Sequence, residues 1–104
     1  MAAADVNEMP NYTRQNMPSG HPDDYEFFCN GAAVGRCYHR PFADAGRQWS
    51  WSIYIGIHVK RLVEGMPVHG HGATLELAEQ DFIEAFDRMI EAGVVALPDD
   101  TSVV

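Results

Sequence analysis

The stretch QWSWSIYIGIHV, residues 48–59, has the clearest periodicity in the chain. Large apolar residues occupy every second position, and these are Trp49, Trp51, Ile53, Ile55, Ile57 and Val59. A period of two places such a set on one face of a β-strand, with the intervening residues on the other. We therefore expect a half-buried strand from Gln48 to Val59, with a bend or bulge at Gly56.

A helical period follows the strand along the chain. Thr74 is a suitable N-cap, and Gly93 lies where a left-handed residue ends a helix. Apolar residues between them recur at steps of three and four, namely Leu75, Ala78, Phe82, Ala85, Phe86, Met89 and Ile90. This stripe predicts one helix of about five turns whose apolar side covers the Trp49–Val59 face of the sheet.

A β-hairpin is indicated upstream by the dipeptide Asn30-Gly31, which tolerates the two positive φ angles of a type I′ turn. The flanking segments, 25–29 and 32–40, are extended in character. In that hairpin Cys29 faces Ala32 and Asp24 lies near Cys37, so the two thiols are not cross-strand partners. Residues 41–47 are predicted to form a loop, and residues 68–72 a glycine-rich connection.

These elements predict an α+β fold, a three-stranded antiparallel meander (β-β-β-α) packed on one C-terminal helix. We expect one domain at residues 23–94, preceded by a flexible N-terminal arm (residues 1–22) and followed by a short C-terminal tail (residues 95–104). A core of roughly 70 residues is only marginally sufficient for a stable monomer, and oligomerisation is a common remedy. A homodimer is therefore expected.

Composition indicates the cellular location of the protein and the state of its cysteines. The 104 residues carry a net charge of −8, and no segment approaches the roughly 20 apolar residues of a bilayer crossing. The N-terminus lacks the pattern of a secretory signal, so we expect a cytoplasmic protein without membrane association. The two cysteines are too few for a disulfide framework.

The charge is unevenly distributed along the chain. Acidic residues dominate the predicted helix, whereas the sheet region contains the basic residues Arg36, Arg40, Arg47, Lys60 and Arg61. Arginines interleaved with aromatic residues are found in proteins that bind single-stranded nucleic acid. The acidic helix and the net charge of −8 would repel a phosphate backbone, so nucleic acid is not the expected partner.

Two short patterns contain potential metal ligands. His69-Gly70-His71 and Cys37-Tyr38-His39 each place two such side chains on one face of an extended segment. Neither has the spacing of a structural zinc motif. A metal site at His69 and His71 is one interpretation, and a histidine pair on a surface loop is the other. Residues 69–74 also lead into a helix N-terminus, where an anion can bind, although no phosphate-binding fingerprint is present.

The residues do not form a recognisable catalytic set. Strand geometry separates the side chains of Cys37 and His39 by about 7 Å, too far for direct proton transfer. The carboxylates lie mostly on the outer side of the predicted helix or near the chain ends. We therefore expect no enzymatic activity and no cofactor, although a pocket built from distant residues would escape this reasoning.

Three short motifs suggest a family. Val34-Gly35-Arg36-x-Tyr38, Trp49-x-Trp51-Ser52-Ile53 and Ala73-Thr74-Leu75-x-x-Ala78-x-x-x-Phe82 together resemble a set of short alphaproteobacterial proteins with no assigned activity. The junction at residues 70–78 also resembles, more loosely, the HicB-type antitoxin domain. The first resemblance implies a β-β-β-α domain without catalytic residues, and the second implies binding of a small ribonuclease toxin.

One face of the predicted sheet is left uncovered by the helix. Its candidate partner-binding residues are Tyr38, Tyr54, Phe28, Arg36 and Arg40. An exposed aromatic face is typical of an interaction surface. The sequence thus favours a small non-enzymatic protein-interaction or regulatory module that acts as a homodimer. The alternative is a protein that binds a metal or small ligand through His69 and His71.

Overall fold

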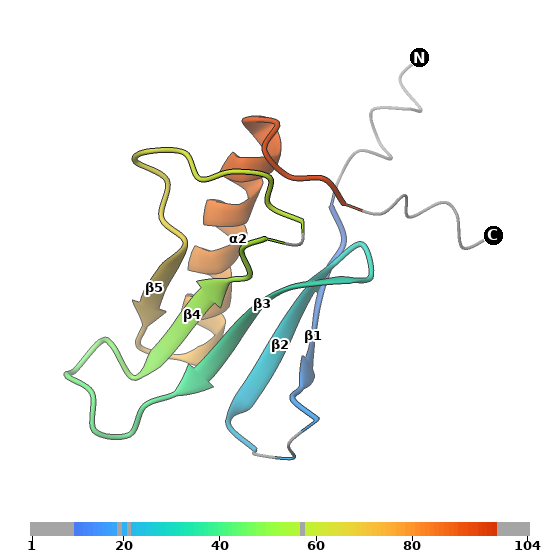
Figure 1. The fold of residues 1–104 in the computed structure, drawn as a ribbon. Coiled ribbons are helices and arrows are strands. Elements are labelled where there is room, and N and C mark those ends of the chain that lie inside the picture. Colours follow the sequence, from blue (N-terminus) through green and yellow to red (C-terminus); the bar gives the residue numbers. More distant parts are fainter. Residues whose placement is uncertain (1–9, 19, 21, 57, 98–104) are drawn as a thin grey trace.

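The computed structural model describes residues 10–18, 20, 22–56 and 58–97. Within this part of the chain, five strands form one antiparallel sheet in the order β1-β2-β3-β4-β5. The strands are β1 (Tyr12–Asn16), β2 (Asp24–Cys29), β3 (Ala32–His39), β4 (Trp49–Ile53) and β5 (His69–Gly72). Each strand pairs with the next along the chain, and a single described helix, α2 (Leu75–Glu91), covers one face of the sheet (Figure 1). The α+β class and the C-terminal helix are confirmed, but the prediction of three strands is wrong.

The two additional strands lie in segments predicted to be irregular. β1 belongs to the predicted N-terminal arm, and it pairs with β2 along its whole length, from Tyr12 opposite Cys29 to Asn16 opposite Tyr25. β5 replaces the predicted glycine-rich connection and pairs with β4. Both are short edge strands whose side chains do not alternate between apolar and polar, so periodicity alone does not reveal them.

The strand predicted at Gln48–Val59 is shorter than expected. β4 ends at Ile53, and the chain then leaves the sheet through Gly56, which has a φ of 105°. Ile55, which continues the apolar alternation, is exposed. Val59 returns to the core and forms an isolated bridge with Val95. The apolar alternation therefore spans two separate elements.

The hairpin joining β2 and β3 has the predicted turn. Asn30 and Gly31 have φ angles of 52° and 85°, and Cys29 lies opposite Ala32. The register shifts between Phe27 and Phe28, a β-bulge that leaves one extra residue on β3. Beyond the bulge, Asp24 lies opposite Tyr38 and Tyr25 lies opposite Cys37, so the predicted placement of Asp24 beside Cys37 is wrong by the one residue that the bulge adds.

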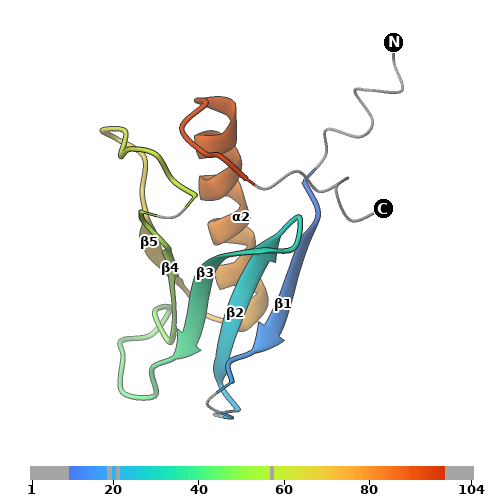
Figure 2. The same cartoon turned by 45° about the vertical axis from the view of Figure 1, so that its right-hand side comes forward.

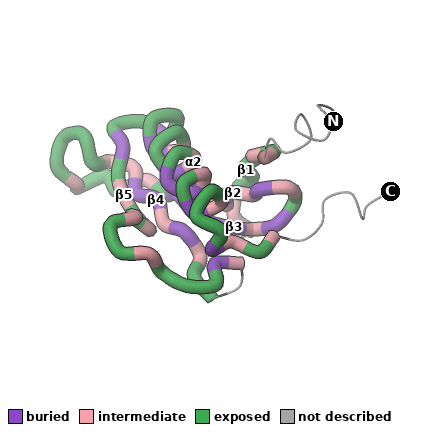
Figure 3. Tube along the Cα trace, turned by 90° about the horizontal axis from the view of Figure 1, so that it is seen from above, coloured by how far each residue is buried: buried purple, intermediate pink, exposed green. Residues whose placement is uncertain are grey.

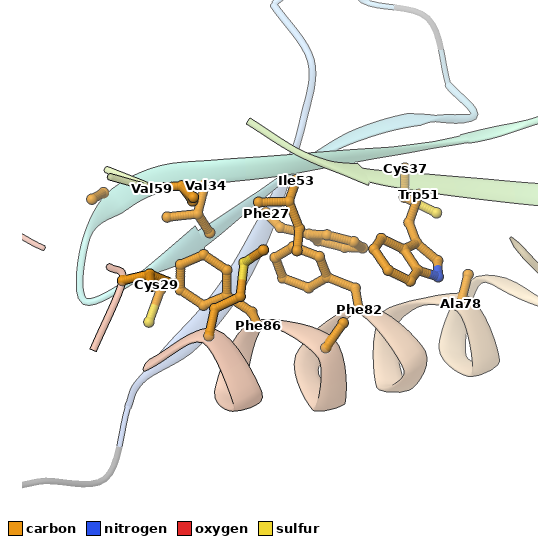
Figure 4. Close-up of a cluster of buried hydrophobic side chains, with 14 of the residues drawn as sticks. Phe27, Cys29, Val34, Cys37, Trp51, Ile53, Val59, Ala78, Phe82 and Phe86 are labelled. Atoms are coloured by element: carbon orange, nitrogen blue, oxygen red, sulfur yellow. The ribbon is translucent and has the colours of Figure 1, made fainter. Parts of the chain in front are cut away.

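Helix α2 has the predicted caps and the predicted buried stripe. The Thr74 hydroxyl accepts a hydrogen bond of 3.1 Å from the backbone N–H of Leu77, and Gly93 follows the helix with a φ of 75°. The buried helix residues are Leu75, Ala78, Phe82, Ala85, Phe86 and Met89. They pack between helix and sheet against Phe27, Val34, Trp51 and Ile53 (Figure 4).

The core therefore lies between α2 and one face of the sheet, and the other face has no layer over it in the described chain. Figure 2 shows the five strands side by side with α2 behind them. Viewed from above, the outward side of α2 is largely exposed (Figure 3). Across the described ranges, no helix has the length and apolar character needed to cross a bilayer.

Candidate functional site

The sheet face opposite α2, hereafter the open face, is built by strand alternation. Gly35, Trp51 and Gly70 are directed toward the helix side, so their neighbours along each strand are directed away from it. The open face therefore carries Asp24, Glu26 and Phe28 of β2, Arg36 and Tyr38 of β3, Ser50 and Ser52 of β4, and His69 and His71 of β5.

The register arranges these side chains in two rows across the sheet. One row runs Glu26, Arg36, Ser52, His69, and the other runs Asp24, Tyr38, Ser50, His71. Carboxylates thus lie toward β2, and imidazoles lie on the β5 edge. The open face therefore carries acidic side chains on one side and basic side chains on the other.

An ion pair links the two rows on the β2 side. The guanidinium of Arg36 donates to both carboxylate oxygens of Asp24, at 2.9 Å from Nε and 2.7 Å from Nη2. This hydrogen bonding raises the pKa of Arg36 further above its ordinary value. The same guanidinium lies 5.2 Å from the ring centre of Tyr38, a cation–π contact. Arg36 therefore fixes both neighbours in place.

Tyr54 completes the β2 side of the open face. Its hydroxyl donates a hydrogen bond of 2.8 Å to Glu26. Burial of the phenol, together with this bond to a carboxylate, raises the pKa of Tyr54 to about 12. Tyr54 is therefore a neutral donor at physiological pH.

The β4–β5 side of the open face is hollowed. A depression of about 210 Å³ lies over β4 and β5 and is bordered by Tyr38, Arg40, Ser50, Ser52, His69 and His71. Arg40 reaches into it and lies 3.5 Å from the hydroxyl of Ser50. Tyr38 is 38% exposed beside it. This side presents the Arg40 guanidinium together with hydroxyl and imidazole groups.

The structure brings the residues predicted for partner binding together. Tyr38, Tyr54, Arg36 and Arg40 gather at or beside the open face, and Phe28 is half-buried on it. That they bind a partner stays a prediction. Sequence reasoning missed Asp24 and Glu26, because their partners on β3 depend on the bulge. It also did not use Ser50, although the alternation in residues 49–53 places Ser50 on the open face.

His69 and His71 share the open face from alternate positions of β5, a strand and not a loop. Both are exposed. Among the described residues, no group of three or more His, Cys, Asp or Glu side chains surrounds a common metal position. Metal binding by the histidine pair stays a prediction.

Cys37 lies on the opposite, helix-facing side of β3 and is fully buried (Figure 4). Burial in apolar surroundings raises the pKa of its thiol to about 12. His39 packs against Trp49, with ring centres 5.0 Å apart. The Cys37 thiol is therefore protonated at physiological pH and packs in the core.

Comparison with known proteins finds no match to this chain among protein-family models, curated proteins or solved structures. The resemblances to the alphaproteobacterial set and to HicB-type antitoxins stay predictions. The function is therefore inferred from the open face.

Proposed function

We propose that this protein is a small non-enzymatic interaction module that forms a homodimer through its open face. The observation that carries the proposal is the distribution of charge across that face. On the β2 side Arg36 neutralises Asp24 and leaves the Glu26 carboxylate, whereas Arg40, which follows β3, lies over β4 beside the histidines of β5. The open face is thus complementary to a second copy of itself.

Self-complementarity is what two-fold symmetry demands. In an isologous dimer the same patch meets itself rotated by half a turn, so each half must suit the other. A two-fold axis that runs along the central strand β3, near Tyr38, would bring the carboxylate side of one protomer over the cationic side of its partner. Tyr38 would then lie at the centre of the interface, where partly exposed aromatic residues contribute most to binding.

Pairing of the open face with the outer side of α2 is less favourable. That side is acidic, with Glu76, Asp81, Glu84 and Glu91 exposed. It also lies on the opposite side of the molecule from the open face (Figure 2). Such contacts would be heterologous and would generate chains of molecules instead of closed dimers.

The test is sedimentation equilibrium of the full chain and two matched variants. Tyr38→Glu places a carboxylate at the centre of the open face, whereas Leu77→Glu makes the same change at a residue that is 53% exposed on α2. We expect a dimer for the parent chain, a dimer dissociation constant raised at least about tenfold for Tyr38→Glu, and an unchanged constant for Leu77→Glu. Circular dichroism establishes that both variants fold.

Three results would contradict the proposal: a monomeric parent chain, an unaffected Tyr38→Glu dimer, or equal disruption by Leu77→Glu. Salt provides an independent readout. Salt screens the attraction between exposed charges, with a Debye length of roughly 8 Å at physiological ionic strength. The dimer should therefore weaken as the salt concentration rises. A purely apolar interface would not weaken in this way.

A further inference from the structure

A second hollow lies at the margin of the open face, where the loop after β3 meets the end of β5. It has a volume of about 220 Å³ and is bordered by Arg40, Phe42, Ala43, Asp44, Arg47 and His71. Arg40 and His71 also border the first hollow, so the two depressions adjoin. The second one is formed mainly by the loop and lies beside the two rows of the open face.

The two arginines at this hollow form no ion pair with a carboxylate of the described residues. The ion pairs found in the described part of the chain involve Arg14 and Arg36, and neither Arg40 nor Arg47 takes part in one. Asp44 is the single carboxylate residue on the border. The hollow thus combines two guanidinium groups and an imidazole with one acid, on a chain whose net charge is −8.

We propose that Arg40, Arg47 and His71 bind the phosphate group of a small phosphorylated molecule in this hollow. Guanidinium groups present a planar fork of N–H donors that matches the oxygens of a phosphate, and charge-assisted bonds of this kind are about twice as strong as neutral ones. His71 adds an imidazole N–H donor from strand β5, opposite Ser50 of β4. Donors thus converge from the loop and from the sheet.

The size and setting of the hollow favour a small molecule over a nucleic-acid strand. Its cationic character is confined to one loop and one strand end, and electrostatic interactions are screened beyond roughly 8 Å at physiological salt. A single phosphate experiences mainly this local field. An extended polyanion would also meet the acidic residues of β2 and α2, which repel it.

Phe42 supplies a surface for the remainder of the ligand. Its side chain is 99% exposed, on the loop between the two arginines. An aromatic ring beside a phosphate site can stack on a planar group such as a nucleobase. We therefore expect a nucleoside monophosphate to bind more tightly than inorganic phosphate does.

The test is a titration of the full chain with inorganic phosphate and with adenosine monophosphate, followed by amide chemical shifts at constant ionic strength. We expect saturable shifts confined to residues 40–48 and 69–72. The double variant Arg40→Gln/Arg47→Gln should weaken binding at least tenfold. The matched control Lys60→Gln/Arg61→Gln removes the same charge from residues that border neither hollow, and it should bind as the parent does. Phe42→Ala should abolish the preference for the nucleotide.

The proposal is overturned by shifts that do not saturate, by equal binding to the double variant, or by acetate binding as well as phosphate. It is also overturned if an oligothymidylate binds with an affinity that rises with strand length, which would identify a nucleic-acid site. Arg40 and His71 also border the hollow of the open face, so sedimentation is measured on the same double variant. A dimer that does not bind phosphate contradicts the phosphate site alone, and a monomer that binds phosphate contradicts the dimer alone.

Discussion

Gly70 of β5 lies directly opposite Trp51 of β4, and a methyl group at Gly70 would lie 2.7 Å from the Trp51 indole ring. The indole occupies the space that a side chain on β5 would need. Its N–H donates a hydrogen bond of 2.9 Å to Asp81 of α2, which fixes the ring between strand and helix. Gly72 is equally confined, because a methyl group there would lie 2.5 Å from the backbone nitrogen of Ala78. The alternation of histidine and glycine in β5 thus separates an exposed face from a tightly packed one.

Gly70→Ala is expected to destabilise the protein by about 1–3 kcal/mol, the usual cost of overpacking a closely fitted site. The measurement is urea denaturation followed by tryptophan fluorescence. His69→Ala, which alters the exposed side of the same strand, should change the free energy of unfolding by less than about 0.5 kcal/mol. Equal effects of the two substitutions would refute the close packing of Trp51 against β5.

Strand β1 is held to the helix by Tyr12, whose hydroxyl donates a hydrogen bond of 2.6 Å to Asp87. Its ring makes edge contacts with Phe82 and Phe86, at centre distances of 6.2 and 6.3 Å. Tyr12→Phe is expected to cost about 1–3 kcal/mol, because it removes a hydrogen bond to a charged group. Hydrogen exchange at residues 12–16 should accelerate in that variant.

The control for Tyr12 is its neighbour Thr13, which is exposed. Thr13→Ala should leave both stability and exchange nearly unchanged. If residues 12–16 of the parent chain exchange as fast as an unstructured peptide, β1 is not docked and the expectation of a flexible arm is restored.

Stability should fall as the pH rises above 9. Burial raises the pKa of the Cys37 thiol from its usual 9.0 to about 12, and burial with the Glu26 hydrogen bond raises that of Tyr54 from 10.0 to about 12. Between these values the unfolded chain loses protons that the folded chain keeps, so the unfolded state gains stability with pH. Each group contributes a slope of up to about 1.4 kcal/mol per pH unit.

Denaturation curves recorded between pH 8 and pH 11 measure this loss. Tyr54→Phe and Cys37→Ala each remove one titrating group, and each should flatten the decline even where the variant is less stable at pH 8. A decline that is unchanged in both variants would show that other groups cause it.

The caps and stripe of α2 could be predicted because they depend on neighbours within a few residues. Thr74 and Gly93 act through local backbone geometry, and a helical repeat appears directly in the order of residues. The Asn30-Gly31 turn is equally local. Strands β1 and β5 could not be predicted in this way, because their pairing depends on partners elsewhere in the chain and neither has large apolar residues at every second position.

The candidate site also combines features that depend on local sequence with features that depend on contacts between distant segments. The sequence by itself determined which residues alternate on a strand, and therefore that Arg36 and Tyr38 share a face, because side-chain direction in a strand is local. Only the tertiary structure decided that Asp24 pairs with Arg36 and that His71 adjoins Arg40. Those contacts depend on the bulge in β2 and β3 and on the close fit of β5 against Trp51, which are properties of packing between segments far apart in the chain.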